Sequence, residues 1–182
     1  VDYLALEGTE AGTIGAPPIL EDDFGLPTLI GLCRAVEHLG NRDPEGRVSL
    51  IAAGGFNSPG HYLKALALGA DAVYLGTMPL FAASHTQVLN AIPFEPPTQV
   101  ALYNGKYSHR YNWKTGADAL YKYLKSCTAE LEEGVRALGK ESLSQVNRED
   151  LVALDKETSA ITGLPLAYER RSTRAFTASG AK

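Results

Sequence analysis

Two pairs of small residues, each placed directly after a short apolar run, have the clearest chemical potential in this sequence. Gly54 and Gly55 follow the letters VSLIAA, and Gly76 and Thr77 follow the letters AVYL. Apolar runs of this length without alternation are typical of parallel strands covered on both faces. Two such strand ends lying side by side, each leading toward a helix N-terminus, present backbone N–H groups that can bind a phosphate. The sequence therefore predicts a phosphate site at these four residues.

The elements that must position this site favour an α/β fold. A glycine after a strand is ordinary turn chemistry, so one pair alone is weak; two pairs with a helix between them are a stronger signal. In a (βα)8 barrel the shared phosphate site lies in the loops after the last two strands, and no strand pattern follows Leu75. We expect about three βα units, the C-terminal portion of a (βα)8 TIM barrel, followed by an α-helical C-terminal extension. Their strands are predicted at 2–6, 48–53 and 72–75.

The same residues resemble a known family. GGF followed by KALALGADAVYLGT is similar to the end of an FMN-dependent (βα)8 barrel and also to inosine-monophosphate dehydrogenases. The segment VDYLALEGTEAGTIGAPP resembles the strand and glycine-rich loop in the FMN domain of glutamate synthase, where the family reads roughly D-x-I-x-x-x-G-x-x-G-G-T-G-A-x-P. The later segment VNREDLVALDKETSAITGLPLAY is also similar to glutamate-synthase-like FMN proteins, so the resemblance covers most of residues 1–168.

The resemblance implies roles for the loop after the first strand. Gly12 and Thr13 match the family's Gly-Thr, which lies close to the flavin and the substrate. Glu10 stands where the family keeps an acidic residue and is the catalytic candidate, since it could orient a substrate amine or the flavin edge. The alternative for Glu10 is a solvated loop carboxylate. Ala11 and Ile14 replace family glycines, and the bulk of Ile14 puts the detailed substrate contact in question.

The function that the resemblance implies is FMN-dependent redox chemistry. FMN would bind through its phosphate at the four small residues, and an imino or oxo acid would be reduced to an amino acid, as when 2-oxoglutarate and ammonia give L-glutamate. Glutamate synthases hold an iron–sulfur cluster, but this chain has only Cys33 and Cys127, too few for three or four thiolate ligands. Its flavin would then be reduced directly, by NAD(P)H, by a ferredoxin-like protein or by a substrate. Two alternatives stay open: a non-redox barrel that binds a phosphorylated metabolite or nucleotide, and a structural remnant with an empty phosphate site.

Composition limits the class of partner and site. The chain has 182 residues and a net charge of −4, which argues against nucleic acid as the main partner. It has neither a secretory signal nor an apolar run of the roughly 20 residues that span a bilayer, so a cytoplasmic location is expected. His61, His85 and His109 are not spaced as metal ligands. Because the chain starts within a strand pattern, we expect it to pair with a missing N-terminal half of the barrel.

The remaining patterns divide the chain into 1–90, the barrel part; 91–168, a linker, flap and helical extension packing on the barrel; and 169–182, a disordered tail. Helices are predicted from Pro27-Thr28 to Gly40, at 61–68, at 78–87 over the barrel end, and at 117–138. Asn104-Gly105 predicts a β-hairpin turn within the flap. Asn147 and Asp150 predict a capped turn, after which Leu154 is expected to pack with its neighbours.

Overall fold

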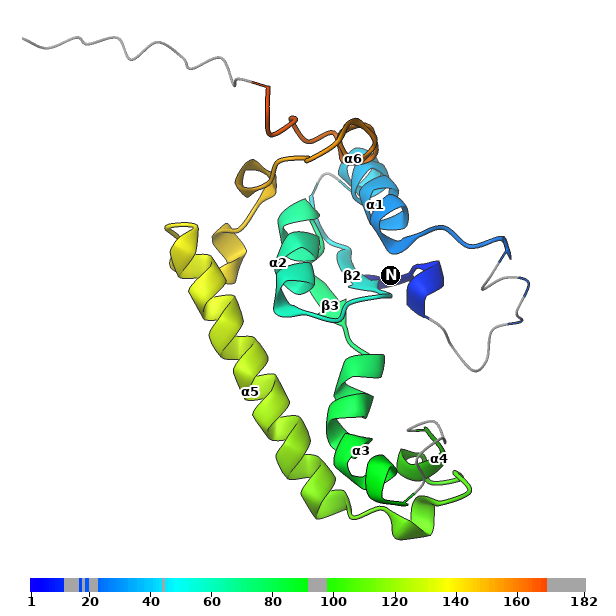
Figure 1. Cartoon of the computed structure of the whole chain (residues 1–182). Helices are drawn as coiled ribbons and strands as arrows, with labels where there is room; N and C mark the ends of the chain where they lie inside the picture. The colour runs from blue at the N-terminus through cyan, green and yellow to red at the C-terminus, as the bar shows by residue number, and fades with distance from the viewer. Residues whose placement is uncertain (12–16, 18, 20–22, 44, 92–97, 170–182) are drawn as a thin grey trace, which may run out of the picture.

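The computed structural model describes residues 1–11, 17, 19, 23–43, 45–91 and 98–169. Within these residues, a small parallel sheet with two helices on one face is joined to a long helical arm (Figure 1). The strands and α-helices are β1 (Tyr3–Glu7), α1 (Thr28–Arg42), β2 (Ser49–Ala53), α2 (Pro59–Leu68), β3 (Ala72–Tyr74), α3 (Thr77–Ala91), α4 (Thr98–Ala101), α5 (Trp113–Ala137) and α6 (Lys156–Thr162). Short 3₁₀ turns are η1 (Thr9–Ala11), η3 (Ser108–Arg110), η4 (Leu143–Gln145) and η5 (Arg148–Asp150).

The three strands are parallel and ordered β1-β2-β3. Their register sets Glu7, Ala53 and Tyr74 side by side, so all three strands end at the same edge of the sheet. The α/β class and the three parallel strands are therefore confirmed. The described strands form an open sheet, and the closed barrel stays a prediction.

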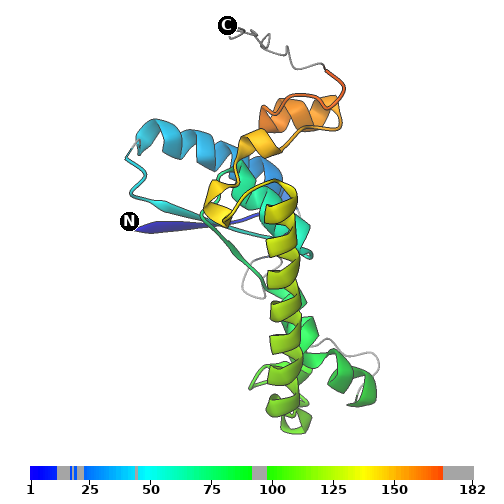
Figure 2. The same ribbon diagram turned by 90° about the vertical axis from the view of Figure 1, so that its left-hand side faces the viewer.

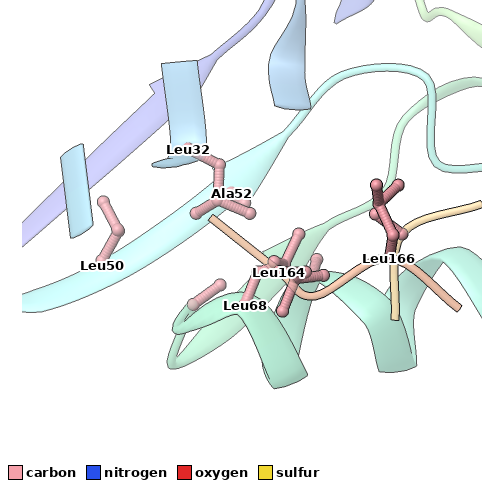
Figure 3. Packing of buried hydrophobic residues seen from close by; sticks show 9 residues of the cluster. Leu32, Leu50, Ala52, Leu68, Leu164 and Leu166 are labelled. Atoms are coloured by element: carbon pink, nitrogen blue, oxygen red, sulfur yellow. The ribbon is translucent and has the colours of Figure 1, made fainter. Parts of the chain in front are cut away.

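Helices α1 and α2 cover one face of this sheet because their apolar side chains and those of the strands form one core. Leu50 and Ala52 of β2 belong to the same buried cluster as Leu32 of α1 and Leu68 of α2 (Figure 3). Ala153, Leu164 and Leu166 complete it, although they lie far away in the sequence. Backbone hydrogen bonds between residues 153 and 165–167 hold that last segment. The extension therefore packs on the helical layer and fixes it.

Local signals explain where the helices begin and end. Ser58 and Pro59 open α2, and Gly69 ends it in the left-handed conformation at a φ of 117°, which costs a glycine little. Helix α1 continues past Gly40 to Arg42, so its expected end was two residues early. The Asn147–Asp150 turn carries the predicted capping box.

The arm consists of α3, α4 and α5, and Figure 2 shows it extending away from the sheet. Helix α3 packs mainly on α5 rather than over the strand ends, so its expected position was wrong. The Gln87 side chain donates to the Asn112 carbonyl at 3.1 Å and accepts from the Asn112 N–H at 2.7 Å. The Tyr111 hydroxyl donates to the Ala83 carbonyl at 3.2 Å. These bonds fix the start of α5 against α3.

The predicted β-hairpin at Asn104-Gly105 is wrong, because this region forms α4, a turn and η3. Val100, 1% exposed, is buried as part of the short helix. The Gln99 side chain and carbonyl then accept from the backbone N–H groups of Lys106 and Tyr107. Leu154 is also not packed as expected, since it is 78% exposed. The predicted tail beyond residue 169 lies outside the described residues.

Candidate functional site

A cavity of about 550 Å³ lies at the edge where the three strands end. It brings together five of the seven predicted site residues: Glu10, Gly54, Gly55, Gly76 and Thr77. These come from three loops widely spaced in the sequence, and the strand register aligns them. The other two, Gly12 and Thr13, lie outside the described residues. The geometry thus places both small-residue pairs and the predicted carboxylate around one space.

The backbone around this cavity has the features that a phosphate requires. Gly54 and Gly55 have φ values of 111° and 69°, a region that favours glycine. Among the residues that the structure describes, the N–H groups of Gly54, Gly55, Gly76 and Thr77 donate to no protein acceptor. Helix α3 begins at Thr77, so its first N–H groups and its dipole carry partial positive charge at the cavity. A Cβ at Gly76 would meet open space within 4 Å. The donor set fits a phosphate group.

The side-chain charge of the cavity is negative. Glu7 and Glu10 line it, and its lining within the described part of the chain includes no lysine, arginine or histidine. Backbone dipoles alone therefore provide the attraction for an anion here. A bound phosphate would gain from a cationic side chain supplied from outside these residues.

Glu10 does not point freely into solvent. Its Oε2 accepts from the Thr28 N–H and from the Thr28 hydroxyl, both at 2.8 Å. Partial burial acts to raise its pKa, but hydrogen bonds from Thr28 and from its own backbone N–H together lower the pKa below the ordinary value. The carboxylate is thus held ionised at the first turn of α1, where negative charge interacts favourably with the helix dipole.

Thr28 is a site-associated residue that sequence reasoning missed, because it was considered only as the start of a helix. It is 6% exposed, and its hydroxyl lies 3.1 Å from the Gly54 carbonyl and 3.3 Å from the Ala53 carbonyl. A Cβ added to Gly8 would clash with the Thr28 backbone and hydroxyl. Glycines at both loops therefore let the backbone close around this threonine. No local pattern in the sequence signals this contact.

The histidines and cysteines lie away from the cavity lining. His85 stacks on Phe81 with ring centroids 5.5 Å apart, and His61 is exposed on α2. Burial raises the pKa of Cys33, with Arg148 opposing the change. In the described residues no three His, Cys, Asp or Glu side chains are grouped to hold a metal ion. None of the described helices is long and apolar enough to cross a membrane.

Comparison with known proteins identifies the family. The model for the conserved region in glutamate synthase matches residues 1–141. The chain belongs to the glutamate synthase family. The conserved region thus includes the sheet, the cavity lining and all but the last elements of the chain.

Individual relatives within this family cover nearly all of the chain. A glutamate synthase large subunit-like protein of Rhizobium meliloti is 31% identical over 91% of this chain and 41% of its own length. An archaeal glutamate synthase [NADPH] of Archaeoglobus fulgidus is 29% identical over 92% of this chain and 34% of its own. The chain therefore spans well under half the length of these curated relatives.

More distant similarities were also found. An inosine-5'-monophosphate dehydrogenase of Borreliella burgdorferi is 31% identical over 59% of this chain and 23% of its own length. A solved structure of a mutant flavocytochrome b2 with benzoylformate aligns with 88% of this chain and 32% of its own at 21% identity. Its TM-score of 0.45 is too low to assign a fold.

Proposed function

We propose that this chain is the FMN phosphate-binding part of a glutamate-synthase-type oxidoreductase. The observation that supports this most strongly is the single cavity that unites Gly54, Gly55, Gly76, Thr77 and Glu10 at the strand ends. The reaction would reduce an imino or oxo acid to an amino acid, with 2-oxoglutarate and ammonia giving L-glutamate as the family's example. The archaeal relative carries NADPH in its name, which makes NADPH a natural candidate for the reductant.

The chain's own residues would bind and orient the cofactor. The N–H groups of Gly54, Gly55, Gly76 and Thr77 would donate to the phosphate oxygens, and the α3 N-terminus would add its dipole. FMN, when bound, supplies the electron transfer, while the protein supplies position and electrostatics. Gly12 and Thr13 would lie beside the flavin and substrate. Glu10, held ionised by Thr28, would fix the loop that carries them.

The electron path would differ from that of cluster-containing glutamate synthases. Cys33 and Cys127 are the only cysteines among the 182 residues, and they lie on α1 and α5 respectively. An iron–sulfur cluster needs three or four cysteine ligands. A cluster would therefore need ligands from other residues of a longer protein; without them, NAD(P)H or a ferredoxin-like protein would reduce the flavin directly.

The open sheet would be completed by other residues of a longer protein. On its uncovered face Tyr3 and Tyr74 are 60% and 52% exposed. Parallel strands are almost always covered on both faces. The relatives are more than twice as long as this chain, so further βα units could close a (βα)8 barrel over this face. The same units could supply the cation that the cavity lining lacks.

A second candidate function uses the same phosphate site without redox chemistry. The similarity to an inosine-5'-monophosphate dehydrogenase, which is itself named as a redox enzyme, supports only the choice of a nucleotide as the ligand of this site. The two candidates differ in colour, because a protein with bound flavin is yellow, whereas one with a bound phosphate ester and no flavin is not. Purified full-length protein with a bound phosphate ester and no flavin spectrum would favour the second.

A charge placed in the cavity tests the phosphate site directly. Gly76→Asp adds a carboxylate where a Cβ meets open space, so the fold should survive while FMN binding weakens at least tenfold, or about 1.4 kcal/mol. Gly40→Asp is the matched control, because a Cβ there also meets nothing within 4 Å and it lies on α1 outside the cavity lining. Equal flavin affinity in both variants would contradict the assignment.

A further inference from the structure

We propose that Thr28 is a positioning residue that ties the loop after β1 to the phosphate-binding turn after β2, acting through Glu10. This inference rests on the proposed function. Thr28 does not line the cavity, yet we infer that cofactor affinity depends on its hydroxyl group. The role is distinct from that of the residues that would touch the phosphate.

The Thr28 hydroxyl lies between the loop after β1 and the turn after β2. The Thr28 Oγ1 lies 2.8 Å from Glu10 Oε2 and 3.1 Å from the Gly54 carbonyl oxygen. Its single proton is best donated to the carboxylate, because hydrogen bonds to charged acceptors are the stronger ones. The carbonyl of Gly54 belongs to the turn that would hold the phosphate. One side chain therefore contacts both loops.

The two loops are packed closely against Thr28 and against each other. A Cβ at Gly54 would lie 2.5 Å from the Thr28 hydroxyl, and a Cβ at Gly55 would lie 3.0 Å from Glu10 Cβ. Glu10 thus lies against Gly55 and reaches back to Thr28, while Gly8 donates its N–H to the Ala53 carbonyl at 3.1 Å. The two loops form one unit with Thr28 at its centre.

The contacts of Thr28 determine how well the backbone N–H groups at the cavity are oriented. Phosphate affinity depends on N–H groups that are already oriented, because ordering a loop on binding costs conformational free energy. Glycine adopts many backbone conformations with little cost, so the surrounding contacts must select the positive φ values of Gly54 and Gly55. Removing the Thr28 hydroxyl removes one of the hydrogen bonds that Glu10 accepts and one contact with the Gly54 carbonyl. The turn should then sample conformations that cannot bind the phosphate.

The test is FMN affinity in full-length protein carrying Thr28→Val, Thr28→Ser, Glu10→Gln, and the double change Thr28→Val with Glu10→Gln. We expect Thr28→Val to raise the FMN dissociation constant about tenfold and Thr28→Ser to restore it, since serine keeps the hydroxyl. Glu10→Gln should weaken binding similarly. The Thr28 N–H still donates to residue 10 in every variant, so both changes weaken the same connection, and the double variant should bind FMN less weakly than the product of the two single effects. Either of two results would overturn the proposal. The increases in the FMN dissociation constant of the two single variants could multiply in the double variant, or the Thr28→Val protein could bind FMN as tightly as the wild type does.

A matched control separates positioning from general loss of a buried threonine. Thr162 is 5% exposed, and its hydroxyl donates to the Thr158 carbonyl at 2.6 Å, in α6 and away from the cavity lining. Thr162→Val should lower the melting temperature without changing FMN affinity. Should Thr162→Val weaken FMN binding as much as Thr28→Val does, the effect is structural and the proposal fails.

A readout without flavin separates this proposal from the proposed function. Wild-type protein that binds no FMN refutes the function and leaves the Thr28–Glu10 connection to be judged by stability. The difference in melting temperature between the wild type and the Thr28→Val variant should then be largest near pH 7. It should shrink as the pH falls through the pKa of Glu10, because protonation weakens the bond to Thr28. A gap that is independent of pH, or absent, would overturn the connection itself.

Discussion

The hydroxyl oxygens of Tyr62 and Tyr123 lie 2.8 Å apart and join α2, in the layer that covers the sheet, to α5 of the arm. Tyr62 is 3% exposed. Burial, followed by the hydrogen bond with Tyr62, raises the pKa of Tyr123, so the Tyr123 hydroxyl keeps its proton in the folded protein. The arm is thus attached to the helical layer that covers the sheet through a partly buried polar contact as well as by apolar packing.

Each single replacement in this tyrosine pair should lower the free energy of unfolding by more than half as much as the double replacement does. Tyr62→Phe or Tyr123→Phe leaves the partner hydroxyl without its hydrogen bond, at a cost of about 1–2 kcal/mol in the free energy of unfolding. The double replacement removes both polar groups, so its cost should be lower than the sum of the single costs by about 1 kcal/mol. Urea denaturation measures all three variants. Tyr103→Phe, at a side chain 94% exposed, should change nothing, and strictly additive costs would show that the two hydroxyls are not coupled.

Two glycine-to-alanine changes in helices should have opposite signs. A Cβ at Gly116 in α5 would clash with the Tyr111 hydroxyl and lie 2.9 Å from the Ala83 carbonyl oxygen. Gly116→Ala should therefore separate α3 from α5 and destabilise the protein by about 2 kcal/mol. Gly40→Ala in α1 meets nothing within 4 Å and should stabilise by about 0.5–1 kcal/mol. Thermal melts compare them, and a Gly116→Ala protein as stable as the wild type would refute the tight contact.

Much of the sheet layer could be predicted from sequence because its signals are local. The apolar run before Gly54 and the proline–glycine punctuation around α2 depend on residues within a few positions, and β2 and α2 match those predictions. The parallel register of β2 and β3 is then enough to bring the loop at Gly54 and the loop at Gly76 together. The carboxyl ends of adjacent parallel strands meet at one edge in any such sheet.

The rest could not be predicted, because contacts distant in sequence decide it. The Asn104-Gly105 pair is a strong hairpin signal, yet burial of Val100 and the bonds to Gln99 select a helix and a turn instead. Thr28 and Glu10 are 18 residues apart, and no periodicity connects them. The role of Thr28 required the fold.

The ion pair of Lys140 with Asp150 should make stability depend on pH in the acid range. Their side chains are only 16% and 13% exposed. The hydrogen bond from Lys140, and then the one from the Asn147 N–H, lowers the pKa of Asp150. A carboxylate with a lowered folded pKa stabilises the fold above its unfolded pKa, and this contribution disappears as the pH falls through the folded value.

Asp150→Asn should therefore lower the melting temperature by about 3 °C near pH 7, with the difference narrowing below about pH 4. Asp118→Asn is the control, since Asp118 pairs with Lys122 on a surface where the side chains are 61% and 71% exposed. Exposed ion pairs contribute little to stability, so Asp118→Asn should hardly change the melting temperature at any pH. An Asp150→Asn difference that persists at low pH would mean that the carboxylate charge is not responsible.

The uncovered face of the sheet should behave differently in the chain alone and in a full-length protein. Ala5 of β1 is exposed and pairs with Ile51 of β2, which in turn pairs with Ala72 of β3, at the centre of this face. Other residues of the longer protein would bury it, so Ala5→Lys there should cost more than about 3 kcal/mol, because a buried unpaired charge is strongly unfavourable. In the 182-residue chain the lysine would stay in solvent and should reduce self-association through the open sheet. Ala129→Lys on the exposed side of α5 should be tolerated in both forms. Equal tolerance of Ala5→Lys in both forms would show that nothing covers this face, and the expectation of a closed barrel would then fail.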